Sequence, residues 1–183
     1  TYCEDSDYCS ETNEIYFFSM FEEVYCKFLK IEEFAFESDK NGQNFLHLLA
    51  WFGSFPMLKL VFEKLKSEFL HEDFHNFIKL KSKNGQNILH YAVLNKREKS
   101  VEFFVNFMGN EVSSEVVKEM LRDEDNDKHI PLYYAIELNS FEVFEPIFCL
   151  YEQNFTNAEL LEIFQLEDED GNNFLNLAFL NRE

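Results

Sequence analysis

The segment HEDFH, which contains His71, Glu72 and His75, has residue types and a spacing that could support metal chemistry. In the HExxH pattern, two histidines one helical turn apart bind zinc and the glutamate serves as general base. A catalytic zinc site also needs a third protein ligand. The only acids at a plausible distance, Glu98 and Glu102, fall in another part of the repeat described below. A zinc-dependent hydrolase is therefore an alternative function, and a surface or half-buried histidine pair that binds metal adventitiously is the main interpretation.

The other polar clusters do not match a known catalytic spacing. His47 and His90 lie in one repeated phrase, which favours a structural role for both. The acidic groups at Glu124/Asp125 and at residues 168–170 lack the spacing of a calcium loop, so we expect them at solvated turns. The sequence contains no phosphate-binding loop, serine elbow or dinucleotide fingerprint. We therefore predict no catalytic residue, no metal site and no cofactor.

Composition predicts a mostly helical chain. The 183 residues are 46% hydrophobic and include 23 Phe, whereas 5 Gly and 3 Pro are few for the tight turns of a β-fold. The net charge of −19 would repel phosphate backbones, so we expect no nucleic-acid partner. Apolar runs stay well short of the ~20 residues of a membrane span, so we expect no membrane insertion.

Cysteine usage favours an intracellular protein, cytoplasmic or nuclear. Cys3, Cys9, Cys26 and Cys149 form no CxxC pair, and they are too sparse for a disulfide scaffold. Free thiols in a reducing compartment are the simplest interpretation. Cys3 and Cys9 are close enough in sequence for a bridge or a shared metal, which is the less favoured alternative.

An internal repeat organises most of the chain. The phrase NGQNFLHLLA begins at Asn41, and NGQNILHYAV begins 43 residues later at Asn84. Two further copies align without gaps at residues 130–136 and 173–179, and a fixed period of this kind is typical of solenoids. Each copy opens with a polar turn, and one turn position is occupied by glycine in three copies and lysine in the third: Gly42, Gly85, Lys128 and Gly171. Glycine there would permit a positive φ.

Apolar spacings of 3, 4 and 7 residues predict helices after each turn. The second helix of each copy is predicted from Leu58, Val61, Phe62 and Leu65 and from their counterparts Val101, Phe104, Val105, Met108, Phe144, Ile147, Phe148 and Tyr151. A third apolar set comprises Phe74, Phe77, Ile78, Val117, Met120, Leu121, Leu160, Ile163 and Phe164. We expect this set to extend the second helix or to form a short third helix.

These patterns divide the chain into an acidic tail, a leading unit and four repeats. The tail spans residues 1–14, and a degenerate capping unit spans 15–38 with an amphipathic helix near 15–29. The repeats are predicted at 39–81, 82–124, 125–167 and, in part, 168–183. Because a lone terminal helix is a poor cap, we expect the sequence to be cut from a longer protein.

At these residues the sequence resembles the ankyrin repeat. That family's unit opens with an acidic residue and a glycine, followed by Thr-Pro-Leu-His and small alanines. Matches to that order are Asp39, Gly42, Leu46, His47, Ala50, Gly53, Gly85, Leu89, His90, Ala92, Asp125, Pro131, Leu132, Ala135, Asp168, Gly171, Leu175 and Ala178. The resemblance covers roughly residues 38–183. It implies an all-α fold of turn fingers and paired antiparallel helices in a curved solenoid.

The sequence departs from that family in three ways. The threonine is absent from every copy, proline appears only at Pro131, and histidine becomes Tyr133 and Asn176 in the later copies. The period of 43 also exceeds the family's usual ~33 residues. The additional residues fall between the second helix and the next turn, so the shape of the finger is expected to differ.

The resemblance also implies where a partner would bind, since the family holds ligands with its finger tips and first helices on the concave face. The matching positions are Lys40, Asn41, Gln43, Trp51, Phe52, Lys83, Asn84, Gln86, Leu94, Asn95, Asn126, Asp127, His129, Glu137, Leu138, Glu169, Asp170, Asn172, Leu180 and Asn181. Trp51 could anchor a partner or could pack against the next unit, and the sequence leaves both open. The groove would run from basic to acidic and orient a partner of opposite polarity.

The function that these observations favour is a non-catalytic protein-interaction scaffold or adaptor that binds another protein or a peptide segment. An interaction or targeting domain of a larger enzyme, channel or host-directed effector is the first alternative, and the zinc hydrolase is the second. The sequence does not indicate an oligomeric state.

Overall fold

The structure, a computed structural model, describes residues 36–52, 55–69, 71–168 and 170–180. The predicted acidic tail, the helix near 15–29 and nearly all of the capping unit lie outside the described residues, as do Cys3, Cys9 and Cys26. Helices contain most of the described chain, which confirms the prediction of a mostly helical protein. In this part of the chain there is no strand, and one isolated bridge joins Ser38 to Asn44.

The described helices form three groups of three, followed by a single helix. The first group is α4 (Phe45–Phe52), α5 (Phe55–Glu68) and α6 (His71–Ile78). The second group is α7 (Ile88–Leu94), α8 (Glu98–Glu111) and α9 (Ser114–Arg122), and the third is α10 (Pro131–Glu137), α11 (Phe141–Asn154) and α12 (Asn157–Phe164). The last helix is α13 (Phe174–Leu180). The first helices begin at residues 45, 88, 131 and 174, so the helices repeat in the same steps of 43 residues as the sequence.

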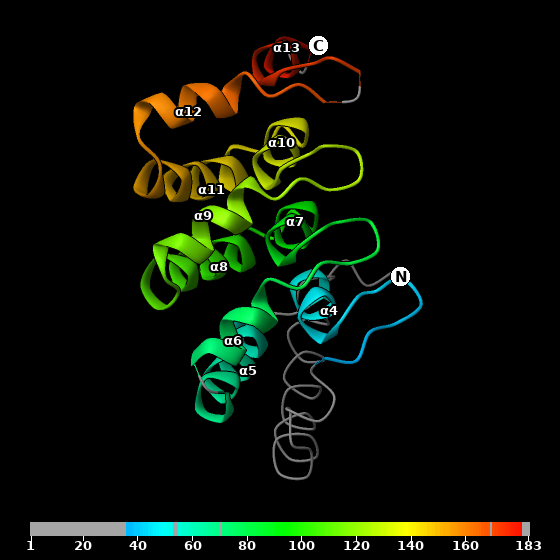
Figure 1. Cartoon of the computed structure of the whole chain (residues 1–183), viewed down its shortest axis with the longest axis vertical. Coiled ribbons are helices and arrows are strands. Elements are labelled where there is room, and N and C mark those ends of the chain that lie inside the picture. The colour runs from blue at the N-terminus through cyan, green and yellow to red at the C-terminus, as the bar shows by residue number, and fades with distance from the viewer. Residues whose placement is uncertain (1–35, 53–54, 70, 169, 181–183) are drawn as a thin grey trace, which may run out of the picture.

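Successive groups pack against one another. The first helices contact in the order α4, α7, α10, α13, and the second helices contact in the order α5, α8, α11. Figure 1 shows the first helices on the side of the connecting turns and the longer helices on the other side. Each turn therefore lies next to the first helices, on the side away from the longer helices.

Local sequence accounts for several helix starts. Asn87 caps α7, and His90 three residues into the helix accepts the reciprocal hydrogen bond of a capping box. Thr156 and Glu159 form a second capping box at the start of α12. Pro131 occupies the first turn of α10, where its missing N–H leaves no helical hydrogen bond unmade.

The third apolar set forms separate helices and joins the core. Helices α6, α9 and α12 bury its members Phe74, Phe77, Ile78, Val117, Met120, Leu121, Leu160 and Ile163. The second helices bury Leu58, Val61, Phe62, Leu65, Val101, Phe104, Met108, Ile147 and Tyr151. The additional residues of the long period therefore build a third helix in each group, which is one of the two predicted arrangements.

The turn position that holds glycine in three copies and lysine in the third copy has a left-handed backbone in every copy. Its φ is 72° at Gly42, 79° at Gly85, 61° at Lys128 and 78° at Gly171. Left-handed backbone is unfavourable for residues with a Cβ atom. The third turn therefore keeps the geometry of the others although a lysine occupies the position.

Lys128→Gly is expected to raise the free energy of unfolding by about 0.5–1 kcal/mol. Glycine removes the strain that a Cβ atom causes in left-handed backbone, and the greater flexibility of glycine in the unfolded chain offsets part of this gain. Urea unfolding followed by circular dichroism measures the change. Gly85→Ala is the matched control, since a Cβ there would lie 3.0 Å from the Cα of Asp125 and should destabilise the protein. A destabilised Lys128→Gly variant would show that the lysine side chain contributes more than the strain costs.

Candidate partner-binding face

Three of the four described turns are built on an aspartate side chain that accepts backbone hydrogen bonds. The Oδ1 atom of Asp39 accepts the N–H of Asn41 at 2.8 Å and that of Gln43 at 2.9 Å. Asp125 and Asp168 close their turns in the same way. The second turn has Ser82 at this position and is closed by backbone hydrogen bonds. The polar residues that open each repeat therefore produce one turn shape.

Neighbouring turns are hydrogen-bonded to one another. The backbone N–H of Lys83 donates to the carbonyl of Asn41 at 2.9 Å, and that of Asn126 donates to Asn84 at 2.8 Å. The Nζ of Lys83 also donates to the carbonyl of Lys40 at 2.6 Å, and the Nδ2 of Asn126 donates to Lys83 at 3.0 Å. These bonds hold the first three turns side by side. The Lys40 side chain is exposed at the edge of this row.

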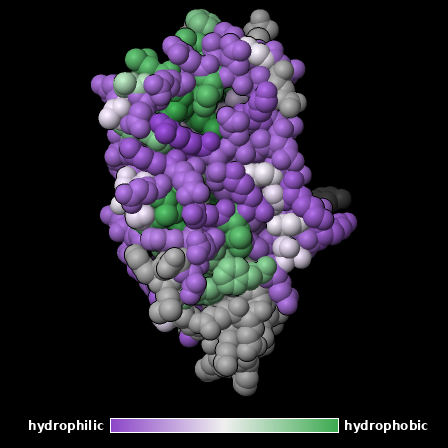
Figure 2. Space-filling view, in the orientation of Figure 1, coloured by the Kyte–Doolittle hydropathy of each residue, from purple (hydrophilic) through white to green (hydrophobic). Residues whose placement is uncertain are grey.

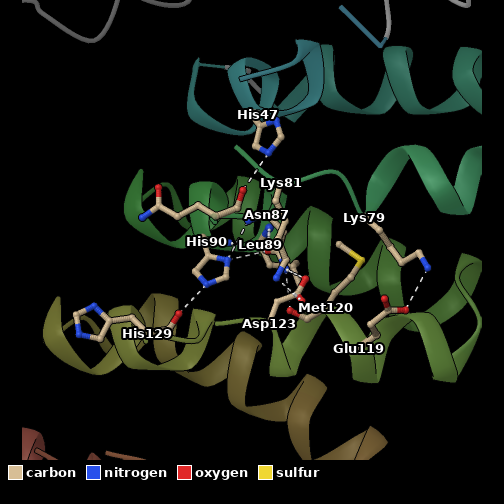
Figure 3. Close-up of polar contacts among 11 residues, drawn as sticks. His47, Lys79, Lys81, Asn87, Leu89, His90, Glu119, Met120, Asp123 and His129 are labelled. Carbon is tan, nitrogen blue, oxygen red and sulfur yellow. Dashed lines mark hydrogen bonds and ion pairs between the residues drawn. The ribbon is translucent and has the colours of Figure 1, made fainter. Parts of the chain in front are cut away.

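Two buried histidines join the second and third turns to the first helix of the preceding group (Figure 3). The Nε2 of His47 lies 3.1 Å from the carbonyl oxygen of Gln86, and the Nε2 of His90 lies 3.0 Å from that of His129. Both carbonyls belong to the following turn, 39 residues further along the chain. The predicted structural role of the two histidines agrees with these contacts.

The other ring nitrogen of each histidine accepts a hydrogen bond. The Nδ1 atoms of His47 and His90 accept the backbone N–H of Asn44 at 3.1 Å and of Asn87 at 3.2 Å. A proton on Nε2 lets each ring donate to its carbonyl. The Nδ1 atom also lies 2.6 Å from the Oδ1 of Asn44 in His47 and 2.9 Å from the Oδ1 of Asn87 in His90, contacts whose donor and acceptor depend on the tautomer. Burial lowers the pKa of His90 to about 4 and lowers that of His47, although the bonded carbonyls act in the opposite direction. Both histidines are therefore neutral at pH 7.

In the third group a tyrosine takes the place of the histidine. The hydroxyl of Tyr133 donates to the Oδ2 of Asp168 at 2.9 Å, and its ring stacks on His129 with centroids 3.6 Å apart. The hydroxyl of Tyr134 donates to Asp125 at 2.6 Å. Burial and these carboxylates raise the pKa of both tyrosines, so both remain hydroxyl donors.

Several residues predicted to bind a partner instead form hydrogen bonds from one helix group to another. The Nε2 of Gln43 donates to the hydroxyl of Tyr91 at 2.9 Å, and that of Gln86 donates to Asp125 at 3.2 Å. The Nδ2 of Asn95 lies 3.4 Å from the carbonyl of Ala50. Other predicted residues remain exposed: Lys40, Asn41, Asn84, Asp127, Glu137 and Asp170.

The predicted aromatic pair is exposed at the end of α4. Phe52 is 68% exposed and Trp51 is 37% exposed, and the Trp51 ring meets Phe52 and Tyr91 edge to face with centroids 6.4 Å and 6.1 Å apart. Trp51 thus packs partly against the next group and remains only partly exposed. Leu48 and Phe55 are exposed as well. The sequence analysis missed these two, although the spacing of Leu48 from Trp51 and Phe52 places these three residues on one side of α4, and Phe55 begins α5.

The possible metal-binding residues fall into two sets. Asp125, Asp127 and His129 offer ligand atoms within 4.8 Å of one another. The hydrogen bonds that close the turn already engage Asp125, so this cluster is explained by the turn itself. In HEDFH, the side chains of His71 and Glu72 lie outside the described residues, and His75 is half-buried on α6. That motif therefore remains a sequence hypothesis.

A scan against protein-family models and a search of curated proteins found no match to the chain. The resemblance to ankyrin repeats accordingly depends on the motif residues and their spacing alone. Among the described helices, none has the length and apolar character needed to cross a membrane.

Proposed function

We propose that this chain is a non-catalytic protein-interaction module, an ankyrin-like helical solenoid that acts as a scaffold or adaptor. It would bind a segment of another protein with its turns and first helices. The observation that carries the proposal is the exposed aromatic pair Trp51 and Phe52 on a first helix, beside turns held in a row by hydrogen bonds. Exposed aromatic side chains on a rigid support are the usual anchors of protein interfaces.

The repeat architecture supports a solenoid. The helix starts recur every 43 residues, and the contacts run from each group to the next. In repeat proteins, each unit buries its apolar face against its neighbours and leaves an extended surface for a partner. The third helix of each group distinguishes this chain from the usual two-helix unit of the ankyrin family.

Charge along the face supports a preferred orientation of the partner. Lys40 is exposed at the first turn, whereas Asp127 and Glu137 are exposed at the third group. A partner segment with an acidic end and a basic end would be steered into one direction by this arrangement. The free thiol of Cys149 is compatible with the cytoplasmic or nuclear location that we include in the proposal.

The proposal predicts that peptides selected from a random display library for binding to this chain lose affinity when the aromatic pair is truncated. Trp51→Ala and Phe52→Ala should each weaken binding by about 30-fold, because a buried aromatic anchor contributes about 2 kcal/mol. Lys40→Glu should weaken binding only mildly, and less at high salt, because a charge at the rim mainly changes the association rate. Fluorescence anisotropy of labelled peptides measures these affinities.

The control variant is Phe141→Ala, which removes an equally exposed aromatic ring from the third group and should leave binding unchanged. Circular dichroism separates anchoring from folding. Trp51 has an edge contact with Tyr91, so its truncation could destabilise the first group. Phe52 is more exposed than Trp51, so its truncation removes less packing and the Phe52→Ala variant tests binding rather than folding. Full affinity of the Phe52→Ala variant for every selected peptide would refute the proposed face.

A further inference from the structure

A groove lies between the second helices of the first two groups. Side chains of α5 and α8 line a recess of about 390 Å³, and Phe62, Phe103 and Phe107 are among them. The Phe62 ring meets the Phe103 and Phe107 rings edge to face, with centroids 5.3 Å and 4.6 Å apart. Phe55, at one end of the groove, is 44% exposed. The α5 residues of the groove run from Phe55 to Lys66, which is roughly 16 Å along a helix and matches a partner helix of three turns.

The next pair of second helices, α8 and α11, packs more closely than α5 and α8 do. A Cβ atom added at Gly109 of α8 would lie 3.4 Å from the Oε1 of Gln153 and 3.9 Å from the Cδ1 of Leu150, both on α11. The first group has Lys66 at the position of Gly109, and the second group has Phe107 at the position of Leu150. These larger side chains hold α5 and α8 apart. The groove therefore results from side chains of two complete neighbouring groups and not from an end of the chain.

Two lysines lie at the Phe55 end of the groove. Lys59 lines the groove one helical turn after Phe55, and Lys99 lies one turn before Phe103 on the same side of α8. The Phe55 and Phe103 rings meet edge to face with centroids 6.0 Å apart, so both lysines adjoin one aromatic pair. Both lysines are exposed, and neither forms an ion pair with a residue that the structure describes.

A positive patch beside aromatic rings contrasts with the rest of the chain. Acidic residues outnumber basic ones by 35 to 16, and hydrophilic residues cover most of the surface that Figure 2 shows. The nearby carboxylates lie elsewhere. Glu98 and Glu102 are on the side of α8 that carries Gly109 and faces α11. Glu63 and Glu111 lie farther along the groove, and Glu111 is already in an ion pair. The end of the groove with the two lysines is therefore positively charged.

We propose that this groove binds a short amphipathic helix of a partner protein, in which aspartate or glutamate lies beside apolar side chains. The apolar side chains would pack on Phe55 and Phe103, and the carboxylates would pair with Lys59 and Lys99. A helix laid into an apolar groove is a common mode of peptide recognition, and charges at the rim select the partner. The groove belongs to the second helices and the proposed function uses the turns and first helices, so either proposal can fail without the other.

Two synthetic helical peptides of about 18 residues test the proposal, a length at which designed helices form. Both carry leucine and phenylalanine at the same positions on one side, and the polar positions beside them are glutamate in one peptide and lysine in the other. We expect the glutamate peptide to bind the whole chain at least about tenfold more tightly in about 0.15 M salt. The net charge of −19 acts in the opposite direction, so overall attraction cannot produce this preference. Amide chemical-shift changes should fall on α5 and α8.

Matched variants separate the groove from other surfaces. Lys59→Glu and Lys99→Glu should each weaken the glutamate peptide about fivefold, and the double variant should bind the lysine peptide more tightly than the glutamate peptide. Lys128→Glu makes the same charge change at the third turn and should alter the affinity less than about twofold. Phe55→Ala should weaken both peptides about tenfold or more, because it removes an aromatic anchor. Phe141→Ala, its counterpart in the third group, should leave both affinities unchanged.

Circular dichroism shows whether each variant keeps its helices, and the charge variants, which alter exposed side chains, decide the question if Phe55→Ala unfolds part of the chain. Equal or tighter binding of the lysine peptide to the parent would overturn the proposal, as would chemical-shift changes confined to α4. Self-association in sedimentation velocity that disappears in Phe55→Ala would assign the groove to a second copy of the chain. A tenfold gain in affinity on Glu4→Gln, Asp5→Asn and Asp7→Asn together would assign it to the acidic segment of the chain itself.

Discussion

Phe77→Asp and Met120→Asp are each expected to lower the free energy of unfolding by about 4 kcal/mol or more, because each buries an unpaired carboxylate and removes a large apolar side chain. Both side chains are fully buried on third helices. The Phe77 ring stacks on Phe69 with centroids 5.4 Å apart and also contacts Phe36. Urea unfolding followed by circular dichroism at pH 7 measures the loss, which would leave a marginally stable domain largely unfolded.

Asn76→Asp is the matched control, since it places the same charge on the exposed side of the same helix. Its effect should stay within about 0.5 kcal/mol, as for most surface substitutions. Phe77→Leu keeps the site apolar and should cost much less than aspartate. Unfolding midpoints of Phe77→Asp and Met120→Asp equal to that of the parent would mean that the third helices are not part of the core.

Acidification is expected to destabilise the fold through its buried histidines. The pKa of His90 is about 4 in the folded chain and 6.5 in its ordinary state. The unfolded chain therefore binds more protons between these values, and stability falls as the pH drops from 6.5 towards 4. A shift of this size corresponds to about 3 kcal/mol at the acid end. His47, whose pKa is also lowered by burial, acts in the same direction.

The measurement is the difference in unfolding free energy between the parent and His90→Asn at several pH values. Asparagine does not titrate, and the fourth repeat already has Asn176 at this position. The unfolding free energy of the parent minus that of His90→Asn should be about 3 kcal/mol smaller at pH 4 than at pH 7. Changes in charge repulsion with pH affect both proteins alike, so they cancel in the difference between the two unfolding free energies. Asp125 and Asp168, whose pKa values are lowered from 3.8, also lose stabilising contributions as the pH falls towards and below that value, and the parent and the variant share this loss. A difference that does not change with pH would contradict the assignment.

Helix positions were predictable to a large extent because helical periodicity is a local property. The apolar spacing located the second and third helices, and the repeated phrase located the first. Whether the third apolar set extended the second helix remained open, since both arrangements have the same period. A local signal for a separate helix was present in the third repeat, where Thr156 and Glu159 have the spacing of a capping box.

The predicted binding face was harder to assess from sequence because it mixes exposed residues with residues that join the groups. Gln43 and Gln86 belong to the same turn position, and both donate to side chains of the following group. Lys83 donates to the preceding turn. The motif identifies these residues as turn residues. It does not specify how one helix group is placed against the next, and that placement determines whether their side chains contact a neighbouring group.

The sequence by itself thus determined the period of 43, the helical class, the polar turns and the glycine position with its positive φ, because these depend on residues close together in the chain. The packing of the groups decided the rest. It set the partial exposure of Trp51 through its contact with Tyr91 and the burial that lowers the pKa of His90. Burial depends on what lies opposite a side chain, and in this chain the opposite residue comes from another repeat.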